Sequence, residues 1–150
     1  MYLRLVCLFA GCLCLCAQSA KLPVVKSRGE IVTLEIAATS QSGRPPVSLH
    51  WEVIFPEQLM EMERDAEVGS AALNSGKSLQ CRLRNPHAYG CVLSGGNNPI
   101  ADGTIAIFHF KIRTAAGAGT TALRIERAVS TTSDSTLFSL DDTEAVVIIR

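Results

Sequence analysis

The chain has 150 residues, with 14 lysine and arginine residues against 14 aspartate and glutamate residues and a formal net charge of +0. A balanced chain without a run of basic residues lacks the electrostatic attraction on which nucleic-acid and anionic-membrane binding depend. Composition therefore argues against both classes of partner, while the length and 47% hydrophobic residues are sufficient for one well-packed domain.

The first 20 residues are predicted to be a secretory signal peptide. Arg4 precedes an apolar run from Leu5 to Ala17, and small residues follow as far as Ala20. Charge, a short apolar core and small residues are typical of a leader that is removed on export. The run is shorter than the about 20 residues that a membrane-spanning helix needs. Residues 1–20 are therefore assigned to a signal peptide, with a lipoprotein leader modified at Cys12 as the alternative, and residues 21–150 to one exported domain.

Alternation of apolar and polar residues predicts strands throughout the rest of the chain. Residues 47–55 alternate most clearly, with Trp51 on the apolar face and His50 and Glu52 on the polar face; this period of two is typical of a half-buried strand. The other expected strands are 22–27, 31–37, 66–69, 79–84, 89–94, 104–113, 122–131 and 145–150. Eight or nine short antiparallel strands separated by glycine- and proline-rich turns predict an all-β, single-domain β-sandwich or jelly roll.

One segment departs from this pattern. Residues 56–65 consist of good helix formers, and Pro56 stands at a suitable first position. A turn of helix is predicted there, running into the strand at 66–69.

Four of the six cysteines lie within the predicted leader, which leaves Cys81 and Cys91 in the exported domain. Each falls on the apolar face of a predicted strand, and the two strands are joined by a turn at 84–87, so the thiols are expected to face each other at bonding distance. In an oxidising compartment such a pair is most often a disulfide. Free buried thiols are the main alternative. A zinc site would need CxxC spacing or a second Cys/His pair, and a thiol nucleophile would need His87 or His109 beside it.

No catalytic or cofactor-binding pattern emerges from the remaining residues. His50, His87 and His109 are scattered over two strands and a turn, where isolated solvated side chains are expected. The closely spaced carboxylates Glu61, Glu63, Asp65 and Glu67 fit a solvated charged face better than a pair of hydrolytic acids. The sequence lacks G-x-S-x-G, P-loop and H-E-x-x-H motifs. We therefore expect no enzyme activity, no metal and no cofactor.

A series of short motifs in a fixed order resembles cohesin domains, within the wider carbohydrate-binding-module superfamily of jelly-roll sandwiches. These motifs are residues 51–56 with Leu59, 68–69, 76–79, 102–110, 117–119 and 123–125. Residues 51–59 are similar to the cohesin pattern F-x-L-x-Y-D-P-x-x-L, and residues 103–110 to G-x-[IL]-A-x-[IL]-x-F. In the first pattern Glu57 follows Pro56 and no Asp precedes it, so the turn there is expected to differ in detail. The cysteine pair is not a general cohesin feature.

The resemblance implies a non-catalytic receptor that binds a dockerin-type protein module through one face of the sandwich. The outward positions of four predicted strands offer the mixture of polar, charged and apolar side chains that protein recognition uses: His50, Glu52, Gln80, Arg82, Arg84, Val92, Arg124 and Glu126. Direct binding of a polysaccharide is the first alternative, although it needs exposed aromatic rings and only Tyr89 remains as a candidate once Trp51 is placed inward. A structural domain of an envelope complex is the second. The expected location is outside the cell, in the periplasm or at the cell surface.

Overall fold

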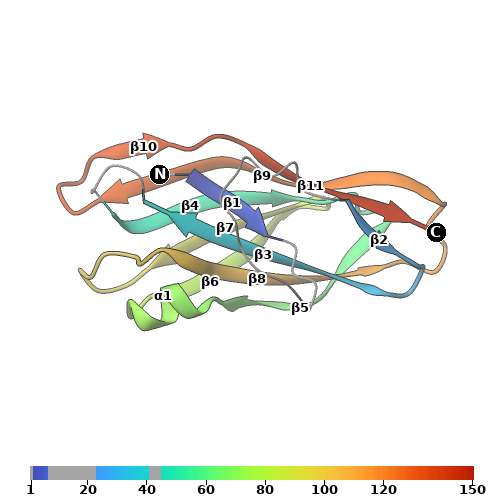
Figure 1. Cartoon of the computed structure of the whole chain (residues 1–150), viewed down its shortest axis with the longest axis horizontal. Helices are drawn as coiled ribbons and strands as arrows, with labels where there is room; N and C mark the ends of the chain where they lie inside the picture. Colours follow the sequence, from blue (N-terminus) through green and yellow to red (C-terminus); the bar gives the residue numbers. More distant parts are fainter. Residues whose placement is uncertain (1, 7–22, 41–44) are drawn as a thin grey trace.

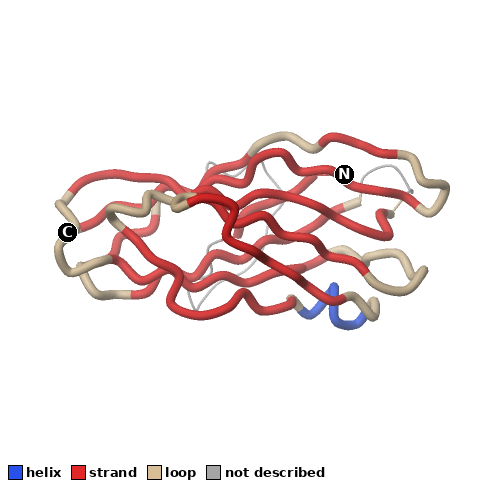
Figure 2. Tube along the Cα trace, turned by 180° about the vertical axis from the view of Figure 1, so that it is seen from behind, coloured by secondary structure: helices blue, strands red, loops and turns tan. Residues whose placement is uncertain are grey.

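The structure is a computed structural model that describes residues 2–6, 23–40 and 45–150 (Figure 1). Strands make up most of it and a short helix lies at one end (Figure 2). In chain order the elements are β1 Tyr2–Val6, β2 Val24–Lys26, β3 Ile31–Thr39, β4 Pro46–Ile54, β5 Met60–Val68, α1 Ser70–Asn74, β6 Ser78–Asn85, β7 Ala88–Ser94, β8 Gly103–Ile112, β9 Gly119–Thr132, β10 Leu137–Ser139 and β11 Thr143–Ile149.

Two sheets pack face to face. The smaller has the order β1-β3-β8-β5, and the larger has the order β2-β11-β9-β4-β7-β6, with β10 added beside β9. Among the described residues, all of the strand pairs are antiparallel except β2 with β11, which is parallel. The predicted all-β jelly-roll sandwich is confirmed.

The core lies between the sheets and consists of the residues that the period of two placed inward. Trp51 on β4 is 1% exposed, and Phe108 and Phe110 on β8 are 0% exposed. Val32, Leu34 and Ile36 of β3 complete the same cluster from the smaller sheet. Because alternate residues of each strand enter this layer, their neighbours face solvent, and the outer surfaces of both sheets are available for other roles.

The helix predicted at 56–65 is wrong, because Met60–Val68 forms strand β5 at the edge of the smaller sheet. Met60 pairs with Ile112 of β8 and is 0% exposed, whereas Glu61 and Glu63 face outward. Pairing with β8 outweighs the helix propensity of this segment, which amounts to only a few tenths of a kcal/mol per residue.

The helical turn occurs instead at α1, directly after the strand. Gly69 marks the transition, since a Cβ atom there would lie 2.3 Å from the carbonyl oxygen of Thr104. Only glycine allows this close approach of two backbones. The buried residues of α1, Ala71 and Ala72, then close one end of the core.

Part of the predicted leader is a strand in this structure. Tyr2–Val6 pairs antiparallel with Glu35–Thr39 of β3, at the edge of the smaller sheet. The expected cleavage region and Cys12 lie outside the described residues, so the signal peptide stays a prediction. Within the ranges given above, no helix is both long and apolar enough to cross a membrane.

Candidate binding face

The eight residues proposed from the sequence as a binding surface all lie on the outer side of the larger sheet, on strands β9, β4, β7 and β6. We call this surface the outer face. Strand register arranges the residues in rows. Gln80 pairs with Val92, Val92 with His50, and His50 with Val129.

The next row runs from Arg82 through Gly90 and Glu52 to Glu126. Glu52 and Glu126, which are 74 positions apart in the chain, are thus neighbours in space, because strand pairing fixes the register between β4 and β9.

Most of the outer face is open to solvent. Of the eight residues, Glu126 is half-buried and Glu52 is buried, and the other six are exposed: His50, Gln80, Arg82, Arg84, Val92 and Arg124. Val92 contributes apolar area at the centre, with 42% of its surface exposed. The face thus combines charged groups with accessible apolar surface.

Glu52 departs from the expected solvated position. It points outward as its place in β4 requires, yet it is only 7% exposed, because Arg127 of β9 lies over it and pairs with its carboxylate at 3.0 Å. Arg127 adopts a φ of 52° at the point where the β4–β9 register shifts between His50 and Glu52. This bulge turns the Arg127 side chain across the neighbouring strand. Arg127 was missed from the sequence, which has no glycine or asparagine there to indicate a positive φ.

The charges on the outer face are only partly balanced. Arg124 pairs with Glu126 at 3.3 Å, and Arg127 pairs with Glu52 at 3.0 Å. Arg82 and Arg84 on β6 form no salt bridge with any described residue. The β6 side of the face therefore carries surplus positive charge.

The hairpin formed by β6 and β7 is closed by a disulfide bond between Cys81 and Cys91, as predicted. The two residues are direct cross-strand partners whose Cα atoms lie 4.1 Å apart. The bond faces the core, where Cys91 is 0% exposed and is the cross-strand neighbour of Trp51 on β4. It therefore fixes the register of the two strands that carry Arg82, Arg84, Gly90 and Val92.

Trp51 and Tyr89 are not arranged to stack on a sugar. Trp51 is 1% exposed, so its ring is unavailable. Tyr89 is half-buried and stacks on Phe55 with ring centroids 5.6 Å apart. One of its ring faces is thus occupied by another aromatic, and Tyr89 contributes to the edge of the core rather than to a flat exposed platform.

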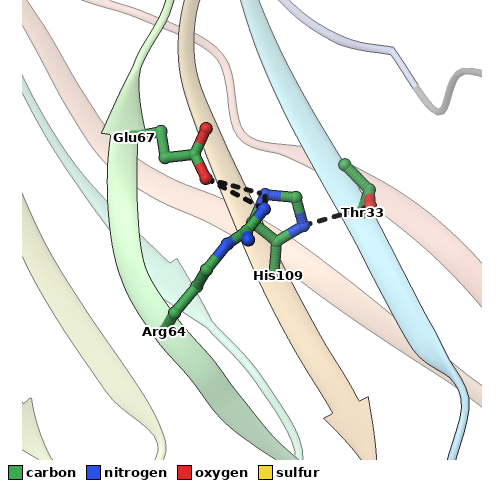
Figure 3. Close-up of polar contacts among 4 residues, drawn as sticks. All are labelled: Thr33, Arg64, Glu67 and His109. Atoms are coloured by element: carbon green, nitrogen blue, oxygen red, sulfur yellow. Dashed lines mark hydrogen bonds and ion pairs between the residues drawn. The ribbon is translucent and has the colours of Figure 1, made fainter.

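The smaller sheet carries a polar network around His109 on its outer side (Figure 3). Arg64 Nη2 lies 2.8 Å from Nε2 of His109, and Thr33 Oγ1 lies 3.2 Å from Nδ1. The guanidinium can only donate in this contact, and Nε2 of His109 also lies 3.4 Å from Oε1 of Glu67. Glu67 completes the network by pairing with Arg64 at 2.9 Å.

This network links three strands of the smaller sheet, with Thr33 on β3, His109 on β8 and Arg64 on β5. The His109 side chain is 13% exposed, so the prediction of an isolated solvated histidine is wrong at this position. His50 and His87 are exposed. In the part of the chain that the structure describes, no three His, Cys, Asp or Glu side chains are grouped to hold a metal ion.

Burial also affects one titratable group beside the larger sheet. Lys77, just before β6, is 4% exposed and donates to the carbonyl oxygens of Gly95 and Gly96 at 2.6 and 3.2 Å. Desolvation lowers the pKa of its ammonium group. These two bonds tie the loop after β7 to the start of β6, which supports the far end of the hairpin.

No protein-family model matches the sequence, and no curated protein matches it either. Solved structures of cohesin modules do match the fold. The sixth cohesin of scaffoldin B from Acetivibrio cellulolyticus, solved in complex with a Cel5 dockerin, has a TM-score of 0.70 and 16% sequence identity, covering 85% of this chain and 94% of that one.

Two further cohesins are similar. The module from a family 33 glycoside hydrolase of Clostridium perfringens has a TM-score of 0.73 and 10% identity, over 87% of this chain and 93% of its own. A non-cellulosomal cohesin from the archaeon Archaeoglobus fulgidus has a TM-score of 0.67 and 13% identity, over 85% and 87%. The resemblance drawn from the short motifs is thereby confirmed in three dimensions: this chain has the cohesin fold.

Proposed function

We propose that this protein is a non-catalytic binding module that recognises a dockerin-type protein module through the outer face. The proposal rests mainly on one observation. Charged, polar and apolar side chains lie together on one accessible sheet surface, aligned by the register of β9, β4, β7 and β6. The fold supports it, since several similar structures are complexes of a cohesin with a dockerin. Fold alone does not fix function, so the surface is the stronger argument.

Two alternative functions are polysaccharide recognition and a structural role in an envelope complex. Direct recognition of a polysaccharide needs an exposed aromatic platform, and the burial of Trp51 together with the stacking of Tyr89 on Phe55 argues against it. A structural role in an envelope complex would use the same face without any link to polysaccharide degradation.

The partner-binding prediction concerns two exposed arginines. Replacing Arg82 or Arg124 with alanine is expected to weaken binding of a cognate dockerin by roughly 1–3 kcal/mol, because interface energy concentrates in a few side chains and arginine is over-represented among them. Both side chains are exposed, so the fold should be retained. Calorimetric titration of each variant with a panel of purified dockerin modules measures the effect.

Arg113 provides a matched control, because it is exposed and pairs with Glu61 of the smaller sheet. Arg113→Ala should leave the affinity unchanged. If no dockerin binds and the native chain instead binds cellulose or chitin, the proposal fails in favour of a carbohydrate-binding module.

We also propose that the domain is exported. The disulfide between Cys81 and Cys91 supports this, because such bonds persist in oxidising compartments, and the N-terminal sequence has the order of a leader. N-terminal sequencing of the mature protein should begin between Gln18 and Lys21. An intact Met1, or lipid on Cys12, would contradict a soluble exported form. Cleavage would also remove β1 and expose the edge of β3.

A further inference from the structure

The unmatched charge on the outer face is confined to two arginines on one strand. Strands β9, β4, β7 and β6 carry four arginines and two glutamates: Arg82, Arg84, Arg124, Arg127, Glu52 and Glu126. Each glutamate is already paired with an arginine of β9. On the next strand outward from β9, Glu144 of β11 lies beside Arg124 and thus at the opposite side of the face from β6. The unpaired positive charge of the outer face therefore belongs to Arg82 and Arg84.

Local backbone geometry directs Arg84 over the sheet instead of away from it. The β6–β7 register shifts between Leu83 and Asn85, which places Arg84 at a bulge. Bulges redirect the side chain they carry. The Cγ and Cδ atoms of Arg84 lie over Gly90 of β7, since a Cβ atom built on Gly90 would be 3.0 Å from both.

Gly90 leaves the space that Arg84 occupies. It is the cross-strand partner of Arg82 on one side and of Glu52 on the other. A Cβ atom at position 90 would press on the stem of Arg84 and force it to shift. The glycine therefore allows the stem of Arg84 to lie in the row that contains Arg82. Two like charges on neighbouring positions repel each other unless an anion lies between them. Arginine, unlike lysine, presents a planar set of donors that matches a carboxylate.

We infer that Arg82 and Arg84 form a binding site for a carboxylate of the partner protein, supplied by an aspartate or glutamate that lies next to an apolar residue. The apolar neighbour would cover Val92, which is 42% exposed and two residues beyond Gly90 on β7. The partner surface is therefore acidic where it meets β6 and apolar where it meets β7. This inference rests on the proposed function only in its choice of face.

Nuclear magnetic resonance of the full-length chain, with arginine side chains labelled, tests the site directly. The probe is the peptide acetyl-Leu-Glu-Glu-Leu-amide, and its control is the same peptide with glutamine in place of both glutamates. The acidic peptide should shift the Nε–H signals of Arg82 and Arg84 and the backbone amides of Gly90 and Val92. The glutamine peptide should leave them unchanged. Equal binding of the two peptides, or stronger shifts with inorganic phosphate than with the acidic peptide, would overturn the inference.

The Gly90→Ala variant tests the position of the Arg84 side chain separately from its charge, because it retains both Arg82 and Arg84. It is expected to weaken binding of the acidic peptide by about 2- to 5-fold, the range for an exposed arginine–carboxylate pair. Gly117→Ala is the matched control, since nothing lies within 4 Å of a Cβ atom there. Equal affinities of the two variants would contradict the role of Gly90. Thermal unfolding of both variants shows whether the domain is intact.

The outcomes distinguish this inference from the proposed function. Binding of the acidic peptide without binding of any dockerin would refute the dockerin proposal and leave the carboxylate site in place. If a dockerin binds with the same affinity to Arg82→Gln and Arg84→Gln as to the native chain, but more weakly to Arg124→Ala, the carboxylate site is refuted and recognition of a dockerin through the outer face stands.

Discussion

Replacing Trp51 with alanine is expected to lower the free energy of unfolding by about 3–5 kcal/mol, the cost of emptying a large aromatic site in a packed core. Trp51 is 1% exposed and is the cross-strand neighbour of Cys91 at the centre of the larger sheet. No described residue accepts a hydrogen bond from its indole Nε1, so the alanine variant loses apolar packing and no polar contact. Denaturant unfolding monitored by circular dichroism measures the difference.

Trp51→Phe is the control for this prediction. Phenylalanine fills much of the same volume, and it should cost less than alanine. If Trp51→Ala retained native stability but lost binding to cellulose or chitin, the indole would be an exposed sugar platform. The burial of Trp51 and the proposal of a protein partner would then both be wrong.

Removal of the disulfide by replacing Cys81 and Cys91 together with alanine is expected to cost about 2–3 kcal/mol. The bond closes a loop with a sequence separation of 10 residues, and in the chain-entropy model its main effect is to restrict the unfolded chain. The paired substitution avoids leaving one buried thiol. Unfolding of the native chain with and without reductant should reproduce the difference.

Mass spectrometry of the exported protein without reductant should show a peptide that links Cys81 to Cys91. Free thiols at both positions in protein recovered from the periplasm or the medium would contradict both the bond and the oxidising compartment.

The strands that a period of two identifies were predictable from sequence. In β8 the buried Phe108 and Phe110 alternate with the less buried His109 and Lys111, and in β4 the buried Trp51 follows the exposed His50. The β6–β7 hairpin was predictable from the position of its turn and from the shared face of its cysteines. These strands and this hairpin depend on the spacing of apolar and turn residues along the chain, which can be read from a single sequence.

The features that sequence did not reveal depend on contacts between distant segments. Strand β5 consists of helix formers and is a strand because β8 lies beside it. The burial of Glu52 requires a bulge at Arg127, a residue with no intrinsic preference for a positive φ. His109 was expected to be solvated and is held by Arg64 and Thr33 from two other strands. Tertiary pairing decides each case, and local propensity is too weak to oppose it.

Hydrogen exchange of a complex between this chain and a dockerin, compared with the chain alone, tests the central claim most directly. If the outer face is the binding surface, amides of β9, β4, β7 and β6 should gain protection, with the largest change around Gly90 and Val92, while β3, β8 and β5 of the smaller sheet stay unchanged. Protection confined to the smaller sheet, or the failure of every dockerin in the panel to bind, would contradict it.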